Sequence, residues 1–600
     1  MKDKVQNIIK TYHDDKTRLM DILLDIQAEF NCIPAEAIET IAGKLNMSKI
    51  DVKQTLSFYH FFTTEPTGTY TVYLNDSAVA MMMGRDEIAK AFEEETGIKF
   101  GSVTEDGLIG LFNTADIGMN DQEPAAIING VPFTKLTTSK VKDLVSGFKA
   151  GKDVQAMVGQ TGDGMNSDAR VRSMVNNNCE KRLGAILCLE YEFGLALRMA
   201  ISRTPETIIE SIKRSGLRGR GGAGFPTGLK WEFCRKSNSD IKYVICNADE
   251  GEPGTFKDRV LLTEMPEQLF EGMAIAAYAI KAEQGILYLR AEYKYMKEYL
   301  EDVLREMRER HHLGNNIAGV NGFNFDIRIQ MGAGSYVCGE ESALIESMEG
   351  KRGEPRNRPP FPVQVGYHGK PTVVNNVETL SKTVKIMLYG AEWFKAIGTG
   401  ESSGTKVLSI SGDCTLPGVY EVEFGMTINE MLNMVGASSV QAVQVAGPSG
   451  LCIGPDKFHQ RISFEVLTTG GAMIVIGEHR NILKDVVLNY MDFFIDESCG
   501  SCSPCRSLTV ILKNKLLKLL NGYGTNNDID ELYNWGMFMK QSNRCGLGQS
   551  AANPILTTIE NFRPLYEALI KSDEEFVSDF EMDKAVEASC KYVNRVPNFH

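Results

Sequence analysis

The sequence predicts a multidomain α/β protein with a thioredoxin-like N-terminal domain, a central α/β domain, a small α+β insert and a C-terminal helical domain that carries a metal cluster. Three observations lead to this fold class. The 600 residues are enough for about four domains. Strand and helix patterns alternate from about residue 70 to residue 490, as in layered α/β folds. Glycine-rich turns and four clustered cysteines mark the later part of the chain.

The first 150 residues divide into helices followed by a small α/β unit. Apolar residues recur at helical spacing before residue 60, and Ser48 is placed to cap a second amphipathic helix. From about residue 70, TYTVYL predicts a strand, and DEIAKAFEEETG predicts a helix closed by Gly97. GLIGLF and PAAIING predict further short strands. This order of elements indicates a thioredoxin-like domain within residues 1–150.

The rest of the chain divides by composition and pattern. Residues 151–180 are polar and rich in glycine and asparagine, which predicts a linker. Residues 181–400 alternate apolar strands such as KYVICNA with helices, which predicts an α/β domain. Residues 401–490 contain short strands around one helix, and residues 491–600 are mostly helical.

Composition excludes several classes of function. The chain has 64 Lys and Arg against 78 Asp and Glu, a net charge of −14, which argues against nucleic acid as a partner. No run approaches the roughly 18 apolar residues of a membrane helix, so we expect no direct membrane insertion. The first residues are charged throughout and lack the apolar stretch of a signal peptide. We therefore expect a soluble, cytoplasmic protein.

Four of the 13 cysteines form a pattern that predicts an iron–sulfur cluster. Cys499, Cys502 and Cys505 lie in ESCGSCSPCR with two residues between successive cysteines, and Cys545 follows in NRCGLG. In a reducing compartment such a group indicates a metal site and not disulfides. Zinc sites usually use two separated pairs of ligands. The spacing therefore favours a 4Fe–4S cluster, with zinc as the alternative.

Two glycine-rich segments are candidates for a phosphate or nucleotide site. In LRGRGGAGFPTGLKW (217–231), glycines allow close approach of the backbone to a ligand, and Arg220 and Lys230 supply charge for a phosphate. NADEGEPGTFKDR (247–259) follows a strand directly, at the edge of a sheet where ligands bind in α/β proteins. Taken singly, the alternatives are an ordinary glycine-rich turn and a solvated acidic loop.

A third segment repeats this design. Residues 332–362 place glycines before the acidic pair Glu340–Glu341, and a Pro-rich turn then presents Arg358 and Phe361. VVNNVET (373–379) adds two adjacent amide side chains. Three such segments in one domain favour a ligand site over three unrelated turns.

The loops and the cysteine pattern together resemble the NADH-binding flavoprotein subunit of respiratory complex I, over about residues 180–600. Residues 1–150 resemble the thioredoxin-like partner subunit of that family, here fused in front. With LSFYHFF and MNDQEPA in the first domain, the fused chain most resembles the diaphorase subunits of soluble NAD-reducing nickel–iron hydrogenases.

The resemblance implies an FMN in the α/β domain, a ubiquitin-like insert at 401–490 and a C-terminal helical bundle that holds a 4Fe–4S cluster. It implies FMN contacts from the glycine-rich loops and from the polar residues at the strand ends. These are Gly219, Arg220, Gly221, Gly222, Lys230, Asn247, Asp249, Glu250, Gly339, Glu340, Asn375 and Asn376.

The resemblance also implies a nicotinamide cofactor beside the flavin, held by aromatic rings and acidic groups. Its contacts would be Phe225, Phe233, Glu252, Glu341, Arg358 and Phe361. Acidic groups near a ribose favour NAD over NADP. Arg358 stands where relatives often carry Lys, which leaves NADP open.

The resemblance gives the cluster ligands as Cys499, Cys502, Cys505 and Cys545. The thioredoxin-like relatives bind a 2Fe–2S cluster through four cysteines, and this chain departs from them. Aligned on YLNDSAVAMMMG and NTADIGMNDQEP, the four positions are Asn75, Ala80, Asp116 and Asn120, and residues 33–178 contain no cysteine. We therefore expect the first domain to dock and support the others without a cluster.

These features imply an NADH dehydrogenase, or diaphorase, subunit of a multisubunit enzyme. FMN would carry the hydride chemistry, so no protein acid or base is expected to be catalytic. The expected partners are an iron–sulfur electron-transfer subunit and a hydrogenase module. The alternatives are the equivalent subunit of an NAD-dependent formate dehydrogenase, or of an electron-bifurcating complex that uses NAD(P)H and ferredoxin. A non-catalytic electron-wiring scaffold and a zinc-bound nucleotide-binding regulator are alternatives from other classes.

Overall fold

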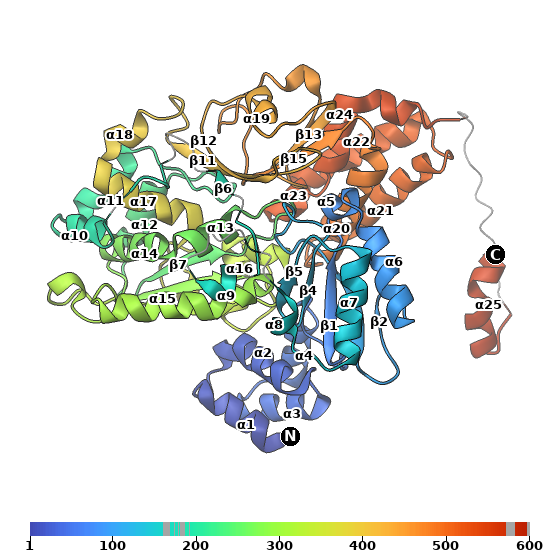
Figure 1. Ribbon diagram of the computed structural model, residues 1–600, viewed down its shortest axis with the longest axis horizontal. Coiled ribbons are helices and arrows are strands. Elements are labelled where there is room, and N and C mark those ends of the chain that lie inside the picture. The colour runs from blue at the N-terminus through green and yellow to red at the C-terminus, as the bar shows by residue number, and fades with distance from the viewer. Residues whose placement is uncertain are drawn as a thin grey trace.

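The computed structural model describes residues 1–159, 162, 168–172, 174–177, 179–180, 186–190, 192–571 and 582–596. Figure 1 shows a broad body built from the α/β domains and the C-terminal helices, with the N-terminal helices projecting below it. The last described helix, α25 (Met582–Tyr592), stands apart from this body.

Four helices form the N-terminal projection. Ser48 caps the fourth one, because its Oγ accepts a hydrogen bond from the Asp51 backbone N–H at 3.0 Å. The Asp51 carboxylate accepts from the Ser48 N–H at 3.4 Å in return. This reciprocal pair confirms the predicted cap. The helices are α1 (Lys2–Thr11), α2 (Leu19–Phe30), α3 (Ala35–Lys44) and α4 (Lys49–Leu56).

The first sheet has the order β2-β3-β1-β4-β5, in which β1 and β3 are parallel and the other neighbouring pairs are antiparallel. Gly97 ends α6 in the left-handed conformation at φ +75°, as predicted. The strands are β1 (Tyr70–Asn75), β2 (Ser102–Val103), β3 (Ile109–Thr114), β4 (Ala126–Ile128) and β5 (Val131–Phe133). The helices are α5 (Ala78–Met82), α6 (Arg85–Thr96) and α7 (Thr138–Lys149).

The second sheet is fully parallel, with the order β10-β7-β8-β9. The carboxyl ends of all four strands therefore meet at one edge, where α/β proteins bind ligands. The strands are β7 (Tyr243–Ala248), β8 (Gln284–Leu289), β9 (Asp326–Met331) and β10 (Thr372–Asn376).

Both faces of the second sheet are covered, by different parts of the chain. Val244 and Cys246 of β7 belong to the core shared with the long helix α14 (Pro266–Ile280). Tyr243 and Ile245, on the opposite face, pack in one core with the N-terminal helices α1–α4. The pattern of residues 1–60 indicated helices, but it did not indicate that they form a layer of the second sheet.

Further helices surround the second sheet. They are α10 (Leu195–Ile201), α11 (Pro205–Arg214), α12 (Thr227–Lys236), α13 (Lys257–Glu264), α15 (Lys297–Glu309), α16 (Glu341–Met348), α17 (Val377–Tyr389) and α18 (Ala391–Lys395).

The third sheet, order β14-β13-β15-β11-β12-β6, is formed mainly by the insert, with α19 (Ile428–Met434) packed in its core. Its edge strand β6 comes from the end of the predicted linker, a segment that also includes α8 (Val154–Met157) and α9 (Ala169–Arg172) and that lies partly outside the described residues. The strands are β6 (Cys179–Glu180), β11 (Thr405–Gly412), β12 (Gly418–Glu423), β13 (Val440–Val445), β14 (Leu451–Ile453) and β15 (Ala472–Gly477).

The C-terminal helices pack against the insert, since Cys452 and Ile474 of the third sheet lie in the same core as Phe494 and Leu556. They are α20 (Leu488–Asp496), α21 (Ser503–Leu520), α22 (Asn526–Ser542), α23 (Gly546–Ser550) and α24 (Asn553–Glu567).

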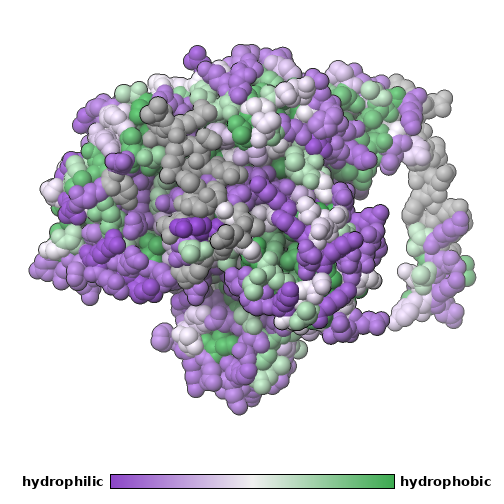
Figure 2. Space-filling view, in the orientation of Figure 1, coloured by the Kyte–Doolittle hydropathy of each residue, from purple (hydrophilic) through white to green (hydrophobic). Residues whose placement is uncertain are grey.

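In the view of Figure 2 the surface is mostly hydrophilic, with apolar residues in small scattered groups. No helix in the described ranges is long and apolar enough to cross a membrane.

Candidate functional site

A cavity of about 560 Å³ lies where the second sheet, the insert and the C-terminal helices meet. Its walls come from the glycine-rich loop at 221–223, from residues 249–258 after β7, and from residues 336–340 before α16. The insert closes another side through residues 446–451 and 468–470, and residues 545–547 contribute from the C-terminal domain. The cavity is therefore an interdomain site at the carboxyl edge of a parallel sheet.

Eight of the twelve predicted FMN contacts line this cavity. They are Gly221, Gly222, Asn247, Asp249, Glu250, Gly339, Glu340 and Asn376. Gly219, Arg220, Lys230 and Asn375 belong to the same segments but do not line it.

The glycine-rich loop leaves open space where a side chain would intrude. Gly222 has φ +130°, a conformation that favours glycine, and a Cβ there would meet nothing within 4 Å. A Cβ on Gly221 would lie 3.2 Å from Asn376 Cβ, and one on Gly470 would lie 3.8 Å from the Gly221 carbonyl oxygen. The backbone of this loop is thus available to a ligand that comes close to it.

Two predicted amide side chains are oriented by the walls. Asn247 Nδ2 donates to the Gly339 carbonyl at 2.8 Å, and Asn376 Nδ2 donates to Asp258 Oδ2 at 2.6 Å. A third amide, Asn375, accepts from Trp231 Nε1 at 2.9 Å and is buried in the wall. The amides are therefore held in place before any ligand arrives.

The Glu250 carboxylate is used by the protein itself. It accepts from the backbone N–H groups of Asp258 and Arg259, at 2.8 Å and 3.1 Å, at the start of α13. It also accepts from the Tyr293 hydroxyl at 2.9 Å. Burial raises the pKa of Glu250 to about 7. The sequence did not indicate this role, because the donors are backbone groups of the following helix.

The cavity fits a ligand with several hydroxyl or carbonyl groups, such as FMN. Among the described residues, Thr255 Oγ1 and Asn553 Oδ1 are buried without a hydrogen-bond partner, and both residues line the cavity. Buried polar atoms normally have partners, so open ones in a cavity wall are suited to a polar ligand. Together with the open glycine backbone, they meet the needs of a flavin with a ribityl chain and a phosphate.

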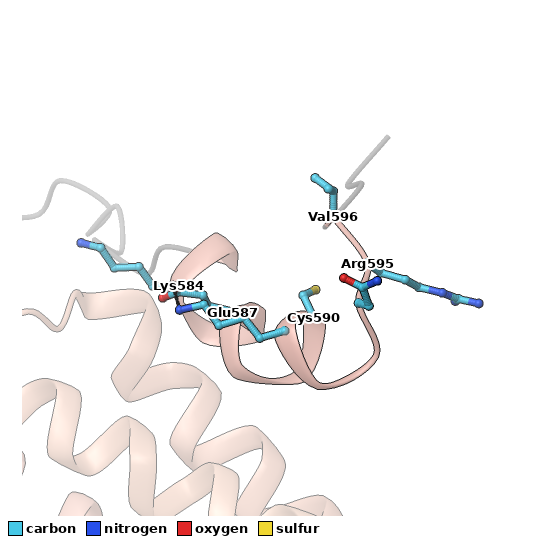
Figure 3. A pocket seen from close by; sticks show the side chains of 7 residues that line it. Lys584, Glu587, Cys590, Arg595 and Val596 are labelled. Atoms are coloured by element: carbon cyan, nitrogen blue, oxygen red, sulfur yellow. Dashed lines mark ion pairs between the residues drawn. The ribbon is translucent and has the colours of Figure 1, made fainter.

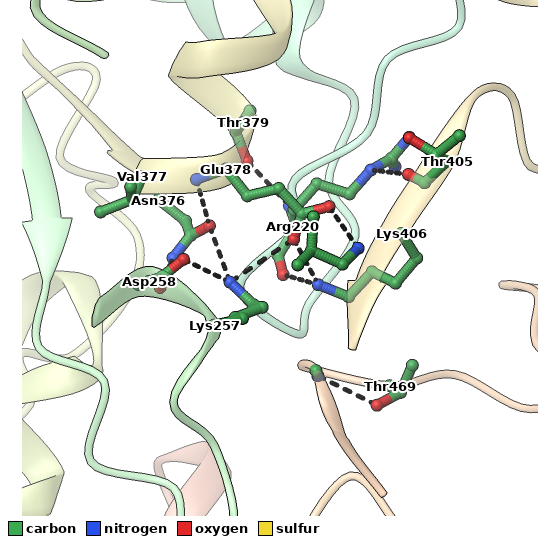
Figure 4. A network of polar contacts seen from close by, with 12 residues as sticks. Arg220, Lys257, Asp258, Asn376, Val377, Glu378, Thr379, Thr405, Lys406 and Thr469 are labelled. Carbon is green, nitrogen blue, oxygen red and sulfur yellow. Dashed lines mark hydrogen bonds and ion pairs between the residues drawn. The ribbon is translucent and has the colours of Figure 1, made fainter. Parts of the chain in front are cut away.

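A buried group of cations lies behind the glycine-rich loop and is organised by one carboxylate (Figure 4). Glu378, at the start of α17, contacts Lys382 Nζ and Lys406 Nζ at 2.7 Å each and Lys257 Nζ at 3.4 Å. All four side chains are at most 1% exposed. Lys406 also donates to the Arg220 carbonyl at 2.8 Å, which ties the group to the loop.

The charges of this group depend on one another. Burial opposes ionisation of Glu378, but Lys382, Lys406 and Lys257 outweigh it and hold the pKa of Glu378 well below its ordinary value. Burial lowers the pKa of Lys406 to about 7 and that of Lys382 to about 8. The positive charge behind the loop is therefore largest at the acidic end of the physiological range.

Arg220 points away from the cavity. Its guanidinium donates to the carbonyl oxygens of Ser403 at 2.6 Å and Thr405 at 3.1 Å, at the start of the insert. The Arg220 Cζ also lies 4.7 Å from the centre of the Phe424 ring. This side chain joins the glycine-rich loop to the insert, while its backbone N–H donates to Thr379 Oγ1 at 2.9 Å.

The predicted nicotinamide contacts fall into two sets. Glu252 lines the cavity, where it accepts from the Tyr336 hydroxyl at 2.5 Å and from the Ser449 N–H at 2.9 Å. Phe225, Phe233 and Phe361 are 45%, 47% and 48% exposed and lie outside the cavity lining. Exposed aromatic faces of this kind are available for stacking.

Ion pairs join the remaining nicotinamide contacts, Glu341 and Arg358, to two of the predicted FMN contacts. Lys230 Nζ lies 2.9 Å from Glu341 Oε2, and Arg358 Nη1 lies 3.4 Å from Glu340 Oε1 and 3.9 Å from Glu341 Oε1. This chain of charges links α12, the start of α16 and the Pro-rich turn beside the cavity.

The four clustered cysteines come together at one end of the C-terminal helices. Cys499 and Cys502 precede α21, Cys505 lies in its first turn, and Cys545 precedes α23. Burial, together with the charges of the other three cysteines, raises the pKa of the Cys505 thiol to about 11. Thiols that repel one another as thiolates in this way are suited to a shared cationic partner.

Within the described residues, no three His, Cys, Asp or Glu side chains are arranged to hold a single metal ion. A zinc ion needs four ligands around one centre, whereas the ligands of a cubane bind four different irons. Cys545 also lines the 560 Å³ cavity together with Gly546 and Leu547. The predicted cluster site and the predicted flavin site therefore share a wall.

A second hollow lies at the far C-terminus, along α25 and the residues that follow it (Figure 3). Lys584, Glu587, Cys590, Arg595 and Val596 are among its lining side chains. None of the predicted site residues lies there.

Comparison with known proteins agrees with this arrangement. Three family models match: the thioredoxin-like [2Fe-2S] ferredoxin over residues 5–149, the Nuo51 FMN-binding domain over 212–385, and the NADH-ubiquinone oxidoreductase-F iron-sulfur binding region over 485–569. The NAD-reducing hydrogenase HoxS subunit alpha of Cupriavidus necator is 47% identical over 588 residues, which is 98% of each chain. The chain belongs to the family of NAD-reducing hydrogenase alpha subunits.

Other members and relatives of this hydrogenase family are similar over large parts of the chain. A crystal structure of a NAD⁺-reducing [NiFe]-hydrogenase in the H2-reduced state contains a chain with a TM-score of 0.85 and 36% identity, covering 97% of this chain and 98% of that one. The NADP-reducing hydrogenase subunit HndC of Solidesulfovibrio fructosivorans is 44% identical over 383 residues, which is 62% of this chain and 78% of HndC.

These matches confirm the predicted family and the fold class. They also confirm FMN and an iron–sulfur cluster, the cofactors that the family resemblance implies. The roles of individual residues stay predictions. The family model that matches the first domain is named for a 2Fe–2S cluster, but the sequence has no cysteine in residues 33–178, which include most of that domain.

Glu378→Gln is expected to lower the free energy of unfolding by about 3–5 kcal/mol, because it leaves three buried ammonium groups without their shared anion. Glu392→Gln is the matched control, since it breaks an exposed ion pair with Arg214 and should cost at most about 1 kcal/mol. Urea unfolding of both variants measures the difference. Equal midpoints would contradict the role given to Glu378.

Cys545→Ala is expected to remove the cluster and to leave the fold in place. The iron content should fall from about four atoms per chain toward zero, together with the broad visible absorption of the cluster. Cys590→Ala on α25 is the control and should retain its iron. Iron analysis and visible spectra decide the matter, and full iron retention in Cys545→Ala would exclude this residue as a ligand.

Proposed function

We propose that this chain is the diaphorase subunit of a NAD-reducing hydrogenase, which moves electrons between NAD(H) and a hydrogenase module through FMN and one 4Fe–4S cluster. The observation that carries the proposal is that Cys545, a predicted cluster ligand, lines the 560 Å³ cavity. A flavin in this cavity would lie beside the cluster, so the two cofactors could exchange electrons without a further carrier.

FMN, when bound, accepts a hydride from the nicotinamide ring and can release the two electrons singly, which an iron–sulfur cluster requires. The residues of this chain would bind the flavin and orient it. The backbone at Gly221 and Gly222 would hold the ligand closely, and the amides of Asn247 and Asn376 would meet its polar edges. The buried cations behind the loop would balance its negative charge.

The predicted nicotinamide contacts and cluster ligands are part of the same proposal. Glu252, Glu341 and the three exposed phenylalanines would receive the nicotinamide cofactor next to the flavin. No side chain is assigned as an acid or base, because hydride transfer needs none. Cys499, Cys502, Cys505 and Cys545 would bind the cluster.

The proposed partners are an iron–sulfur electron-transfer subunit and a nickel–iron hydrogenase module. The 47% identity with the HoxS alpha subunit over 98% of both chains supports this choice over a formate dehydrogenase. The acidic residues of the cavity favour NAD, and the similarity to a subunit of a NADP-reducing hydrogenase keeps NADP open. We also propose a cytoplasmic location, which agrees with the lack of a disulfide among the described residues.

The purified chain, reconstituted with FMN, is expected to oxidise NADH with an artificial electron acceptor. Gly221→Val should abolish this activity and FMN binding while iron content stays unchanged, because the added branches enter the space beside Asn376. Gly400→Val is the matched control, since a Cβ there meets nothing within 4 Å. Steady-state kinetics and flavin content are the measurements.

The proposal fails if the FMN-loaded wild-type chain neither oxidises NADH nor shows bleaching of the flavin band by NADH. Normal activity of Gly221→Val would show that the cavity is not the flavin site.

A further inference from the structure

The loop of residues 116–121, between β3 and β4, connects the thioredoxin-like domain to the cavity. It packs against residues 249–258, which follow β7 and form one wall of the cavity. We call these segments the bracing loop (116–121) and the cofactor loop (249–258). Asp116 and Asp121 of the bracing loop are 2% and 6% exposed, so the contact between the two loops is buried.

The positions aligned with the 2Fe–2S ligands of relatives form one hydrogen-bonded network in this chain. Asn120 Nδ2 donates to the Asp116 carboxylate, and Ser77 Oγ donates to Asn120 Oδ1 at 2.9 Å. The Ser77 N–H donates to Asn75 Oδ1 at 3.1 Å, and the Ala80 N–H donates to Ser77 Oγ at 3.3 Å. These side chains offer oxygen and nitrogen and no thiolate, so they do not fit a 2Fe–2S cluster.

The first contact of this network with the cofactor loop is a hydrogen bond to its backbone. Asp116 Oδ2 accepts from the Gly254 N–H at 2.8 Å, and Asp116 Oδ1 accepts from the Gly118 N–H at 2.5 Å. Gly254 has φ +89°, and a Cβ there would lie 2.7 Å from Ile474 Cδ1 of the insert. Gly254 is thus held between the bracing loop on one side and the third sheet on the other.

The second contact is a fully buried ion pair. Arg259 Nη1 and Nη2 donate to Asp121 Oδ1 and Oδ2 at 3.0 Å and 2.9 Å, and both side chains are 0% exposed. Arg259 Nη1 also donates to the Gly118 carbonyl at 2.7 Å. Paired bidentate bonds of this type fix both position and orientation.

The third contact is Arg290, which bridges the two loops. Its guanidinium donates to the Asp116 carbonyl and to the Glu250 carbonyl, and it pairs with Glu292 at 2.8 Å. Three independent contacts therefore fix the cofactor loop at Glu250, at Gly254 and, one residue past its end, at Arg259. Gly251 and Glu252, two of its cavity-lining residues, lie between the first two of these points.

We propose that Asp116 is a positioning residue for the cofactor site: the network at the former cluster positions holds the cofactor loop in the shape that binds FMN. The thioredoxin-like domain thus supports the flavin site mechanically, through the residues that replace the cluster ligands. The proposal rests on the proposed function only in taking FMN as the ligand of the cavity.

The test compares Asp116→Ala with Asp106→Ala in the full chain. Asp106 lies in an exposed turn of the same domain and also accepts two hydrogen bonds, from Thr104 Oγ1 and the Leu108 N–H, without touching the cofactor loop. Hydrogen–deuterium exchange of the FMN-free chain reports on the peptide that contains Gly254. Fluorescence titration with FMN gives the dissociation constant.

Asp116→Ala is expected to speed exchange in the Gly254 peptide and to weaken FMN binding by about tenfold, because a buried charge-assisted hydrogen bond is lost. Asp106→Ala should change neither. Unchanged exchange in Asp116→Ala would overturn the proposal, and so would faster exchange with unchanged FMN affinity. If no variant and no wild-type chain binds FMN, the proposed function fails, while the exchange result still decides whether Asp116 holds the loop.

Asn120→Ala provides a second variant that is milder than Asp116→Ala. It keeps the hydrogen bond between Asp116 and Gly254 but removes the amide that donates to Asp116. We expect smaller changes of both readouts in the same direction. Should Asp116→Ala fail to fold, wild-type values for Asn120→Ala in both measurements would overturn the proposal.

Discussion

The cavity depends on a single buried carboxylate. Glu378 lies two residues beyond the end of β10, so the same turn of chain that presents Asn376 to the cavity also places this carboxylate behind it. The carboxylate pairs with three ammonium groups that reach it from α13, from α17 and from β11 of the insert. Without it, these cations could not share one dry site. The Glu378 carboxylate and its three lysines therefore join the glycine-rich loop, the second sheet and the insert.

The other parts of the chain stabilise the same cavity from outside. The N-terminal helices cover the face of the second sheet that α14 leaves free, and the bracing loop fixes the cofactor loop through Gly254 and Arg259. The C-terminal helices contribute Cys545 to the cavity wall. An electron-transfer site between two cofactors needs this rigidity, because the cofactors must stay close while substrates enter and leave.

Local spacing made part of this structure predictable. The cysteines of ESCGSCSPCR and the glycines of residues 217–231 are close together in the sequence, so each motif can be recognised without the fold. These motifs were sufficient to predict the cofactors and the family. Long-range partners were not predictable in this way. The sequence predicts that Arg220 supplies charge for a phosphate, but its guanidinium donates to the carbonyl oxygens of Ser403 and Thr405, which lie about 180 residues later. The sequence did not indicate the role of Glu378, because its three cations are brought to it only by folding.

If the cavity and the cluster form one electron path in this chain, NADH should reduce the cluster only when FMN is bound. Anaerobic addition of NADH to the purified chain, followed by electron paramagnetic resonance, measures this. We expect a signal from the reduced cluster when NADH is added to the FMN-loaded chain, and no such signal from the same chain stripped of FMN. A signal of equal size without FMN, or no signal in the loaded chain, would contradict it.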